Sequence, residues 1–362
     1  AHEVSSNVIG GTSVFAADID GDRSIDVASA SSLDSKISWH EQGASAVPGA
    51  VLVPSEYPTI QMGIHAALPM DEVVVAPGLY YETVNFLGKP ITVRSSDGPL
   101  VTTIDPFEEN PFKCNDFEPC VQFRRSEGRD SVLSGFTLTE GLGFVQSGGC
   151  SLAGGGVYTE GASPTIEGCI FVANSAGGLI FEGGSPRIEG CYFEANEPGA
   201  VFSHGGQAEF SDCLFRQHDY TLQAGNGVTL TLDRCRILSS NSGLSGTSGA
   251  TVVVTDCIFG SNFVGVDSRT FGSPSISISG TLFCNNEVAD IDGDYIDAGG
   301  NWFLDACPPL EDVDVDGIVG FTDLLHVLTS WGLCVACPAD IDFSNEVDFV
   351  DLVSVLAAWG VY

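Results

Sequence analysis

Five cysteines recur at an unbroken interval of 22 residues in the middle of a chain of 362 residues. Each begins a variant of the pattern Cys-x-Phe-x-x-Asn, and their positions are Cys169, Cys191, Cys213, Cys235 and Cys257. A fixed period of this length predicts a solenoid, because one repeat cannot bury an apolar face alone and must stack on its neighbours. Polar and apolar residues alternate between the cysteines with a period of two, so we expect strands and turns without helices.

Three short strands and three turns in 22 residues describe one coil of a right-handed parallel β-helix. Equivalent residues of successive coils then lie about 4.8 Å apart and form rows. We expect the Cys row, and the Phe or Ile two residues later, to point inward, since buried cysteine usually behaves as a small apolar residue. A metal or redox role is the alternative for this row. Five positions after each cysteine we expect a turn whose amide side chains bond along the stack. That row is Asn174, Asn196, His218, Ser240 and Asn262.

Residues 53–98 resemble the opening of pectin-lyase-like right-handed β-helix proteins. The resemblance implies an amphipathic helix over 59–68 that caps the core, followed by strands over 73–76, 83–86 and 91–94. A cap is required because an uncovered terminal coil exposes its apolar interior and its strand edges. We expect this all-β solenoid to cover residues 50–309, or about eleven coils.

The chain is strongly acidic, with 48 Asp and Glu against 13 Lys and Arg and a net charge of −35. Such a charge repels phosphate, which argues against nucleic acid and anionic membranes as partners and favours cations. The sequence contains no stretch of about 18 apolar residues, so it predicts no membrane-spanning helix. The chain begins Ala1-His2 without Met or an apolar leader. We therefore expect a processed protein that is secreted or held at the cell surface.

Seven cysteines lie outside the repeat row. Three pairs are candidates for disulfides in an oxidising compartment: Cys114 with Cys120, Cys284 with Cys307, and Cys334 with Cys337. Cys150 has no evident partner.

Two acidic loops near the C-terminus have the spacing of EF-hand-type calcium sites, with ligands at positions 1, 3, 5, 7, 9 and 12. Gly317 and Asn345 stand at position 6, where the sharp turn needs a residue that tolerates positive φ. The first loop predicts Asp312, Asp314, Asp316, Ile318 and Asp323 as ligands. The second predicts Asp340, Asp342, Ser344, Glu346, Asp348 and Asp351. The loops therefore predict bound Ca²⁺.

Each loop leads into a helix that ends in Trp-Gly, over 321–332 and 349–360. Apolar residues at helical spacing predict one apolar face in each helix. They are Phe321, Leu324, Leu325, Leu328 and Trp331, matched by Phe349, Leu352, Val353, Leu356 and Trp359. Two such units 28 residues apart resemble type I dockerin. The resemblance implies that residues 310–362 form a small α-helical module with paired calcium loops, which docks onto a cohesin-like protein. Self-assembly is the other kind of docking that we consider.

Type I dockerins of cellulosomes usually carry a polar recognition pair at loop positions 10 and 11. This chain has Phe321-Thr322 and Phe349-Val350 there. We take these four residues as candidate partner-binding positions. This difference from the usual polar pair bears on which partner the module binds more than on whether the loops bind a metal.

A third acidic loop lies in the N-terminal segment, residues 1–46, and resembles one FG-GAP or VCBS repeat. The matching calcium ligands are Asp18, Asp20, Asp22 and Asp26, although Arg23 stands where Gly is expected. One such repeat cannot close a propeller. The segment therefore packs on the solenoid, belongs to a longer precursor, or is completed by another molecule. A fourth acidic stretch, over 290–297, has a spacing that suits calcium less well.

Catalytic groups are sparse in the repeats. β-Helix lyases need a base beside cations that neutralise a substrate carboxylate, and the basic residues of this chain are scattered. The catalytic candidates are Asp233, Asp256, Arg234 and His218, which would have to converge on one cleft. We interpret Asp212, Arg234 and Asp256 instead as a ladder of charges across neighbouring strands.

The residue after each repeat cysteine is expected to face outward, yet this row is mostly apolar. It consists of Ile170, Tyr192, Leu214, Arg236 and Ile258. An apolar stripe on an outward face indicates that something covers it. The candidates are loops over 105–128 or 143–155 and a neighbouring subunit.

These features favour a secreted, calcium-binding β-helix protein with an extracellular role in structure, assembly or adhesion, which docks through its terminal modules. The alternative is a carbohydrate-active enzyme, a lyase or hydrolase of an acidic polysaccharide, that the dockerin-like tail anchors. No group of residues in the sequence decides between an enzyme and a binding protein.

Overall fold

The computed structural model describes residues 11–17, 26–32, 36–40, 49–106, 119–142, 155–225, 227–246, 249–269 and 275–360. The chain divides into two compact units, Ala1–Gly49 and Ala50–Tyr362. In the first unit, β1 (Gly11–Ala17), β2 (Asp26–Ser31) and β3 (Lys36–His40) form an antiparallel sheet in that order. The second unit contains a β-solenoid and a C-terminal segment with two helices.

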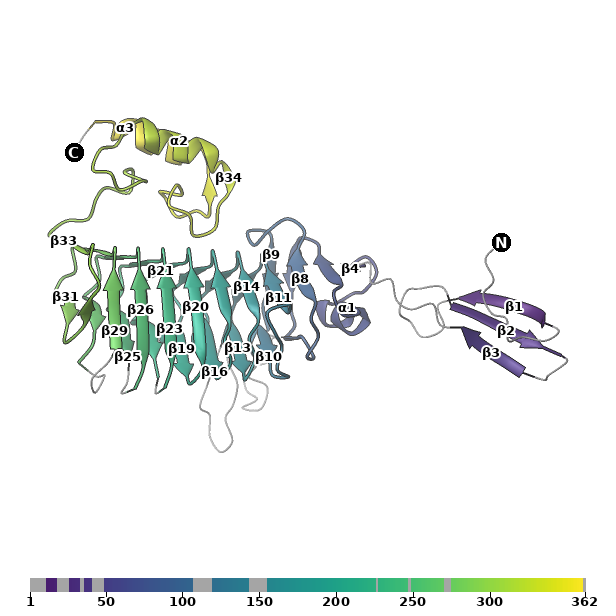
Figure 1. Cartoon of the computed structure of the whole chain (residues 1–362). Coiled ribbons are helices and arrows are strands. Elements are labelled where there is room, and N and C mark those ends of the chain that lie inside the picture. The colour runs from purple at the N-terminus through teal and green to yellow at the C-terminus, as the bar shows by residue number, and fades with distance from the viewer. Residues whose placement is uncertain are drawn as a thin grey trace. The chain divides into compact units, whose positions relative to one another are not determined.

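The solenoid consists of three parallel sheets, and each strand pairs with its equivalents in the neighbouring coils (Figure 1). The first sheet has eleven strands: β4 (Ala50–Val53), β5 (Glu72–Val75), β8 (Thr92–Ser95), β11 (Val132–Ser134), β14 (Thr165–Glu167), β17 (Arg187–Glu189), β20 (Gln207–Ser211), β23 (Thr229–Asp233), β26 (Thr251–Thr255), β29 (Ser275–Ser279) and β32 (Ile296–Asp297). The second has ten: β6 (Gly78–Tyr80), β9 (Thr102–Ile104), β12 (Thr137–Thr139), β15 (Ile170–Val172), β18 (Tyr192–Glu194), β21 (Leu214–Arg216), β24 (Arg236–Leu238), β27 (Ile258–Gly260), β30 (Leu282–Cys284) and β33 (Trp302–Leu304). The third has nine: β7 (Val84–Asn85), β10 (Val121–Phe123), β13 (Val157–Glu160), β16 (Leu179–Glu182), β19 (Gly199–His204), β22 (Tyr220–Ala224), β25 (Ser242–Gly246), β28 (Val264–Asp267) and β31 (Ala289–Asp292).

The inward rows are those that the 22-residue period predicts. All five repeat cysteines are free thiols and are at most 1% exposed. The phenylalanines two residues later stack on one another, with ring centroids 4.3 Å apart for Phe171 and Phe193 and 4.8 Å apart for Phe193 and Phe215. Each buried Phe contributes about 1.5–3 kcal/mol through the apolar area removed from water. The core is therefore a continuous column of like side chains.

The predicted amide row is confirmed at a turn between the second and third sheets. Asn196 donates from Nδ2 to the carbonyl oxygen of Phe171 (2.9 Å), and its Oδ1 accepts from Nδ2 of Asn174 (2.8 Å). Asn262 donates from Nδ2 to the carbonyl oxygen of Ile237 (2.9 Å). Because these side chains are buried, their hydrogen bonds replace those that the turn would otherwise make with water.

The cap over the first coil is α1 (Ile60–Ala66), which lies within the predicted range 59–68. Thr59 begins the helix, and its hydroxyl accepts from the backbone N–H of Met62 (3.1 Å). Ile60 and Ile64 are fully buried against the open end of the core. A Cβ at Gly63 would stand 2.9 Å from Cγ2 of Val53, so only glycine allows this close approach of helix to strand.

Disulfides join Cys284 to Cys307 and Cys334 to Cys337, as the sequence predicts. The expected bridge between Cys114 and Cys120 is wrong, since Cys120 is a free, fully buried thiol in the core of the solenoid. Cys114 and Cys150 lie outside the described residues. Disulfides persist in oxidising compartments, which indicates an extracellular environment. Among the described residues, no helix has the length and apolar character needed to cross a membrane.

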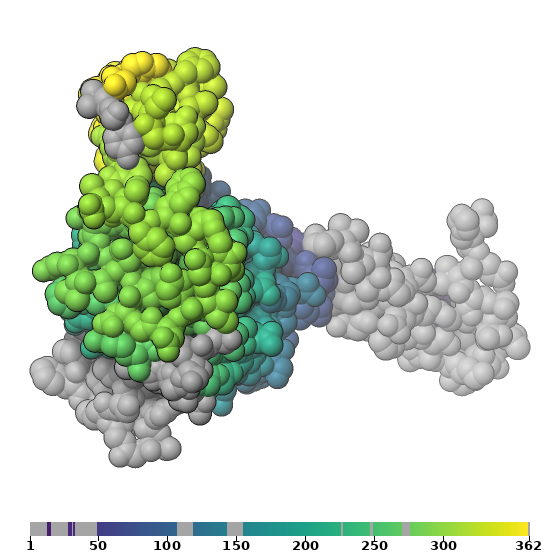
Figure 2. All heavy atoms as spheres, turned by 60° about the vertical axis from the view of Figure 1, so that its left-hand side comes forward, coloured from purple at the N-terminus to yellow at the C-terminus, as the bar shows by residue number. Residues whose placement is uncertain are grey.

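The C-terminal segment contains α2 (Phe321–Thr329), α3 (Phe349–Ala357) and the short strands β34 (Gly332–Leu333) and β35 (Glu346–Val347). It is the lobe coloured green to yellow in Figure 2. A core of its own holds it together: Val319, Val327, Ala339, Ile341, Val347 and Val355.

The helical residues of the predicted apolar faces do not fill this core. Leu324 and Leu352 pack against it, whereas Phe321, Leu325 and Leu328 are exposed. Val327 and Val355 take the inner position instead, because the burial of Asp323 and Asp351 rotates that side of each helix inward. Each helix is therefore apolar on an inner and on an outer face.

We predict that His218→Asn stabilises the solenoid and removes an acid sensitivity. His218 is 4% exposed, its Nδ1 finds no hydrogen-bond partner among the described residues, and burial lowers its pKa to about 4. The unfolded chain protonates this histidine near pH 6.5, whereas the folded chain protonates it only near pH 4. The free energy of unfolding is therefore highest above about pH 6.5 and falls as the pH drops toward 4. Thermal unfolding followed by circular dichroism at pH 7 and pH 5 measures both effects.

The matched control is His204→Asn, because His204 is exposed. This control should leave the pH dependence of the melting temperature as it is in the natural chain. An unchanged pH dependence in His218→Asn would contradict the prediction.

Candidate metal centres and the adjoining pocket

Two carboxylate triads lie in the C-terminal segment, Asp312 with Asp314 and Asp323, and Asp340 with Asp342 and Asp351. In each triad, one carboxylate oxygen from every residue lies within 4.8 Å of the others. The first and last members of each are buried, and the middle member is exposed. The two triads can hold metal ions.

Backbone N–H groups orient the last carboxylate of each loop. Asp323 accepts from the N–H of Val313 at Oδ1 (2.7 Å) and from that of Gly320 at Oδ2 (2.7 Å). Asp351 repeats the arrangement with the N–H groups of Ile341 (2.7 Å) and Asp348 (2.8 Å). Both aspartates stand in the first turn of a helix, where the helix dipole favours negative charge. The helix start thus fixes each carboxylate toward its loop.

The turns of the two loops are also duplicated. Gly317 and Asn345 both have positive φ, 92° and 66°, as predicted for position 6. Their N–H groups donate to Oδ2 of Asp312 (3.0 Å) and Oδ2 of Asp340 (2.7 Å). The loops therefore curl around the first carboxylate in the same way.

The charges of Arg236 and Asp340 act on each other at a distance, but among the described residues neither triad has a basic side chain within ion-pair reach. Within the described part of the chain, no Lys or Arg forms an ion pair with any of the six carboxylates. Burial raises the pKa of Asp340 to about 6, with added repulsion from Asp351 and Asp342, and burial also raises the pKa of Asp312. Buried carboxylates without a counter-charge are costly. The oxygen-only donor set therefore fits a hard divalent cation.

The other predicted ligands of the two loops form hydrogen bonds with backbone groups of their own loops. Oδ1 of Asp316 accepts from the N–H of Ile318 (2.8 Å), and the Ser344 hydroxyl donates to the carbonyl oxygen of Glu346 (2.9 Å). Asp348 caps α3 by accepting from the N–H of Val350 (2.6 Å). Three of the predicted ligands in each loop are thus brought together, and the remaining ones lie beside them.

The N-terminal ligands cannot be placed in the same way. Asp18, Asp20 and Asp22 lie outside the described residues, as does the side chain of Asp26. The acidic stretch 290–297 contributes β31 and β32 to the last coil. There Asp292 pairs with Arg269 (2.9 Å) and Asp297 accepts from Nδ2 of Asn301 (2.7 Å), so both carboxylates have protein partners.

The outward apolar row is covered by the C-terminal segment. Ile170, Tyr192 and Leu214 are 6%, 3% and 1% exposed and form one cluster with Ala336. Val335 and Phe343 pack against the same cluster. The cover that the apolar row indicated is therefore present, and it includes residues 335–343, which the sequence reasoning did not identify.

Two arginines of the solenoid attach this cover. Arg236 donates from Nη2 to the carbonyl oxygens of Ala336 (3.0 Å) and Cys337 (2.8 Å). Arg216 lies over the ring of Phe343, with 4.3 Å from its guanidinium carbon to the ring centroid. Such a cation–π contact contributes about 0.5–2 kcal/mol. Phe343 is position 4 of the second acidic loop, so the loop touches both the triad and the solenoid.

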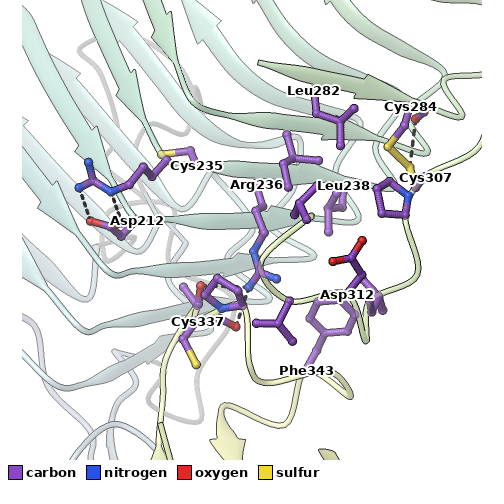
Figure 3. Close-up of a pocket in the computed structure, with 18 of the residues that line it drawn as sticks. Asp212, Cys235, Arg236, Leu238, Leu282, Cys284, Cys307, Asp312, Cys337 and Phe343 are labelled. Carbon is purple, nitrogen blue, oxygen red and sulfur yellow. Dashed lines mark hydrogen bonds and ion pairs between the residues drawn. A yellow bond between two sulfur atoms is a disulfide. The ribbon is translucent and has the colours of Figure 1, made fainter. Parts of the chain in front are cut away.

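A cavity of about 670 Å³ lies between the second sheet and the C-terminal segment. Figure 3 shows Arg236, Leu238 and Leu282 on the solenoid side, and Asp312 and Phe343 on the facing side. The remaining lining combines apolar residues with charged ones. The apolar residues include Ile258, Pro308, Pro309, Leu310, Val313, Val315 and Val335, and the charged ones are Asp212, Arg234 and Asp256. Sequence reasoning missed this pocket, and the only signal for it was one arginine in an apolar outward row.

Arg234 and Asp256 both line this pocket and Asp233 pairs with Arg234, whereas the fourth catalytic candidate, His218, lies apart from them. Arg234 pairs with Asp212 through two bonds of 2.8 Å, which confirms that part of the predicted charge ladder, but its other partner among the described residues is Asp233 and not Asp256. Its hydrogen bonds to Asp212 raise the pKa of Arg234 above its usual range, so the guanidinium stays protonated and cannot accept a proton as a base. Asp256 lines the pocket, whereas His218 lies in the amide row and borders a different depression.

The comparisons with known proteins agree with the solenoid. The family model described as a right handed beta helix region matches residues 140–294, so this region is a right-handed β-helix. No curated protein matches the chain.

Among solved structures, ORF18 of Geobacillus virus E2 is 13% identical with a TM-score of 0.45, over 71% of this chain and 60% of that one. Pectate lyase Pel9A is 14% identical with a TM-score of 0.44, over 72% and 80%. The pectin methylesterase of Aspergillus niger is 10% identical with a TM-score of 0.33, over 73% and 86%. The chain thus spans 60% of the length of the viral protein. These likenesses are distant and say nothing about activity.

We predict that each triad binds one calcium ion and that Asp351→Asn removes one of the two. The substitution keeps the size of the side chain but removes a charge from the second loop, so affinity there should fall by about tenfold or more. Isothermal titration of the calcium-free protein with CaCl₂ counts the sites and gives their affinities.

Asp323→Asn should remove the other site, and Asp305→Asn, at an exposed carboxylate outside both loops, should leave two. A natural chain that takes up no calcium in this titration contradicts the prediction. So does an Asp351→Asn variant with two unchanged sites.

Proposed function

We propose that residues 310–360 form a calcium-binding docking module of dockerin type, carried by a β-helix that works outside the cell. The single observation that carries this proposal is duplication: two triads with the same backbone donors, each followed by a helix with the same exposed apolar side chains. The apolar cover of Ile170, Tyr192 and Leu214 supports a module that is seated on the solenoid.

Calcium is the cation that this donor set suits best. Asp312, Asp314 and Asp323 would hold one ion, and Asp340, Asp342 and Asp351 the other. Carbonyl oxygens of Ile318 and Glu346, at position 7, are the expected additional ligands. A bound ion would neutralise carboxylates that now face one another, and would stabilise the folded module by mass action.

The docking surface is the outer face of the two helices. Phe321 and Phe349 are 65% and 68% exposed, and Trp331 and Trp359 are 51% and 44% exposed just beyond the helix ends. Thr322 and Val350, the other candidate partner-binding residues, are exposed beside them. Leu325, Leu328, Val353 and Leu356 extend the same face. An exposed apolar surface of this kind marks an interaction site. We propose a protein partner, either a cohesin-like domain or a second copy of this chain.

We predict that replacing both Phe321 and Phe349 with Ser abolishes docking and leaves calcium binding intact. Titration against a type I cohesin domain and sedimentation velocity of the protein alone, both in saturating CaCl₂, measure the two kinds of docking. The affinity should fall by at least about 100-fold, since large aromatic residues dominate protein interfaces.

The matched control is Val253→Ser, which changes an exposed valine on β26 of the solenoid. This control should dock normally, and EDTA should abolish docking by the natural chain. A calcium-loaded natural chain that stays monomeric and ignores cohesin would refute the docking proposal.

The second candidate function is an enzyme that acts on an acidic polysaccharide. One observation favours it: Asp256 lies exposed at the pocket, in the row of Asp212 and Arg234, and forms no ion pair with any described residue. A free carboxylate beside a charged row is a possible acid or base. The proteins named pectate lyase and pectin methylesterase have such substrates, which is the reason to choose pectin-type polymers as probes.

The enzyme proposal predicts cleavage of pectate or alginate in the presence of calcium, with a loss of about 100-fold or more in Asp256→Asn. Reducing ends and the ultraviolet absorbance of unsaturated products measure it. Asp130→Asn, at an exposed aspartate on another coil, should retain full activity. The absence of products from the natural chain, or equal activity of both variants, counts against an enzyme.

A further inference from the structure

The two ends of the solenoid differ in how they are covered, and Figure 1 shows α1 at one end and β31 and β33 at the other. At the first coil, α1 packs over the core, and its Ile60 and Ile64 are fully buried. At the last coil, Phe303 continues the inward row of Phe259 and Phe283, with ring centroids 5.2 Å apart at each step. Phe259 and Phe283 are fully buried, whereas Phe303 is 47% exposed. Among the described residues, therefore, none covers the last coil as α1 covers the first.

The last coil exposes further apolar side chains and three strand edges. Four of these side chains are between 43% and 60% exposed: Val288, Ile296, Trp302 and Leu304. The strands β31, β32 and β33 each stand at the end of their sheet, so each pairs with a neighbour on one side only. After β33, the disulfide from Cys307 to Cys284 ties the chain back to the preceding coil and away from the open end. An apolar surface with unpaired strand edges is typical of an interaction site.

The last coil is also acidic. Six acidic residues lie in it or beside it in the sequence: Glu287, Asp290, Asp292, Asp294, Asp297 and Asp305. The basic side chain that the structure shows among them is Arg269, which pairs with Asp292 (2.9 Å) and with Asp267 (2.8 Å). Two copies that met end to end would bring like charges together, which is unfavourable. The open end therefore favours an apolar partner surface that exposes few carboxylates.

The outer face of α2 and α3 is a surface of this kind. Its exposed apolar side chains include Phe321, Leu325, Leu328, Phe349, Val353 and Leu356. The two acidic residues of these helices, Asp323 and Asp351, are fully buried, so neither helix exposes a carboxylate. Within one chain this face is not the cap, because Phe303 stays exposed while Arg236 and Arg216 hold the C-terminal segment on the second sheet.

We propose that the outer face of α2 and α3 in one copy covers the last coil of a second copy. An apolar helix face is what this solenoid already uses at its first coil, where α1 lies over the core. The inference rests on the docking function proposed for the face of α2 and α3, and it names the surface that this face binds. Because the two contacting surfaces differ, the copies join head to tail, and the assembly continues beyond a dimer.

The first test is sedimentation velocity of the full chain in saturating CaCl₂ over about 1–100 μM, a range that detects contacts of micromolar affinity. We expect the natural chain to form species larger than a dimer as its concentration rises. Trp302→Asp places a charge at an exposed position of the open end and should weaken assembly at least about tenfold. Ile296→Asp, on another sheet of the same end, is the second variant and should have the same effect. Leu79→Asp, at a similarly exposed side chain of the first coil, is the matched control and should assemble as the natural chain does.

A mixing experiment tests whether the two surfaces bind each other. Trp302→Asp lacks a working end, and the double variant Phe321→Ser with Phe349→Ser lacks the helical face. Each should be monomeric alone, whereas an equimolar mixture should form a dimer and nothing larger. Both should keep the circular dichroism spectrum of the natural chain, because all three replaced side chains are exposed.

The proposal is overturned if the natural chain stays monomeric at about 100 μM. It is also overturned if both end variants assemble as well as the natural chain does, if the double variant assembles on its own, or if the mixture contains only monomers. Binding of a type I cohesin domain is measured on the same samples. A natural chain that is monomeric but binds cohesin would keep the docking function and lose only this inference, and failure in both assays would remove both.

Discussion

In-register stacking of identical coils is the constraint on which the rest of this structure depends. Each strand of the three sheets pairs in parallel with its equivalents one coil away, so a residue type that recurs every 22 positions becomes a continuous row. Inside, this register stacks Phe171, Phe193 and Phe215. At the turn it connects Asn174 to Asn196 through side-chain hydrogen bonds. A solenoid of this kind gains its stability from neighbouring coils, and for that reason it needs a cap at its open end.

The same register creates a problem on the outside of the second sheet. Ile170, Tyr192 and Leu214 are aligned by the pairing of β15, β18 and β21, and an uncovered apolar row would expose a broad surface to water. The C-terminal segment covers it, and the next residue in the row, Arg236, binds two carbonyl oxygens of that cover. The covered apolar residues, the arginine that binds the cover and the floor of the pocket thus occupy equivalent positions on successive coils.

The second acidic loop belongs both to a candidate metal site and to the contact between the C-terminal segment and the solenoid. Phe343 is part of the second loop and also contacts Arg216, so an ion held by Asp340 and Asp351 would stiffen the loop that touches the solenoid. The chain carries a net charge of −35, and the two triads, which form no ion pair with a described Lys or Arg, add to its self-repulsion. A divalent cation held in each triad would offset both kinds of repulsion.

The sequence by itself determined the coil, its inward rows, the cap helix and the two acidic loops. Each of these depends on residues that are close in the sequence or repeat at a constant interval, so spacing is enough to predict them. Only the tertiary structure decided which helical faces are buried, because α2 and α3 are apolar on two sides and the inward side is selected by the buried Asp323 and Asp351. Only the tertiary structure, likewise, placed Phe343 and Ala336 over the outward row and left Arg236 beside a cavity. Those contacts join residues at least 100 positions apart, and no local pattern specifies how a segment packs on a distant surface.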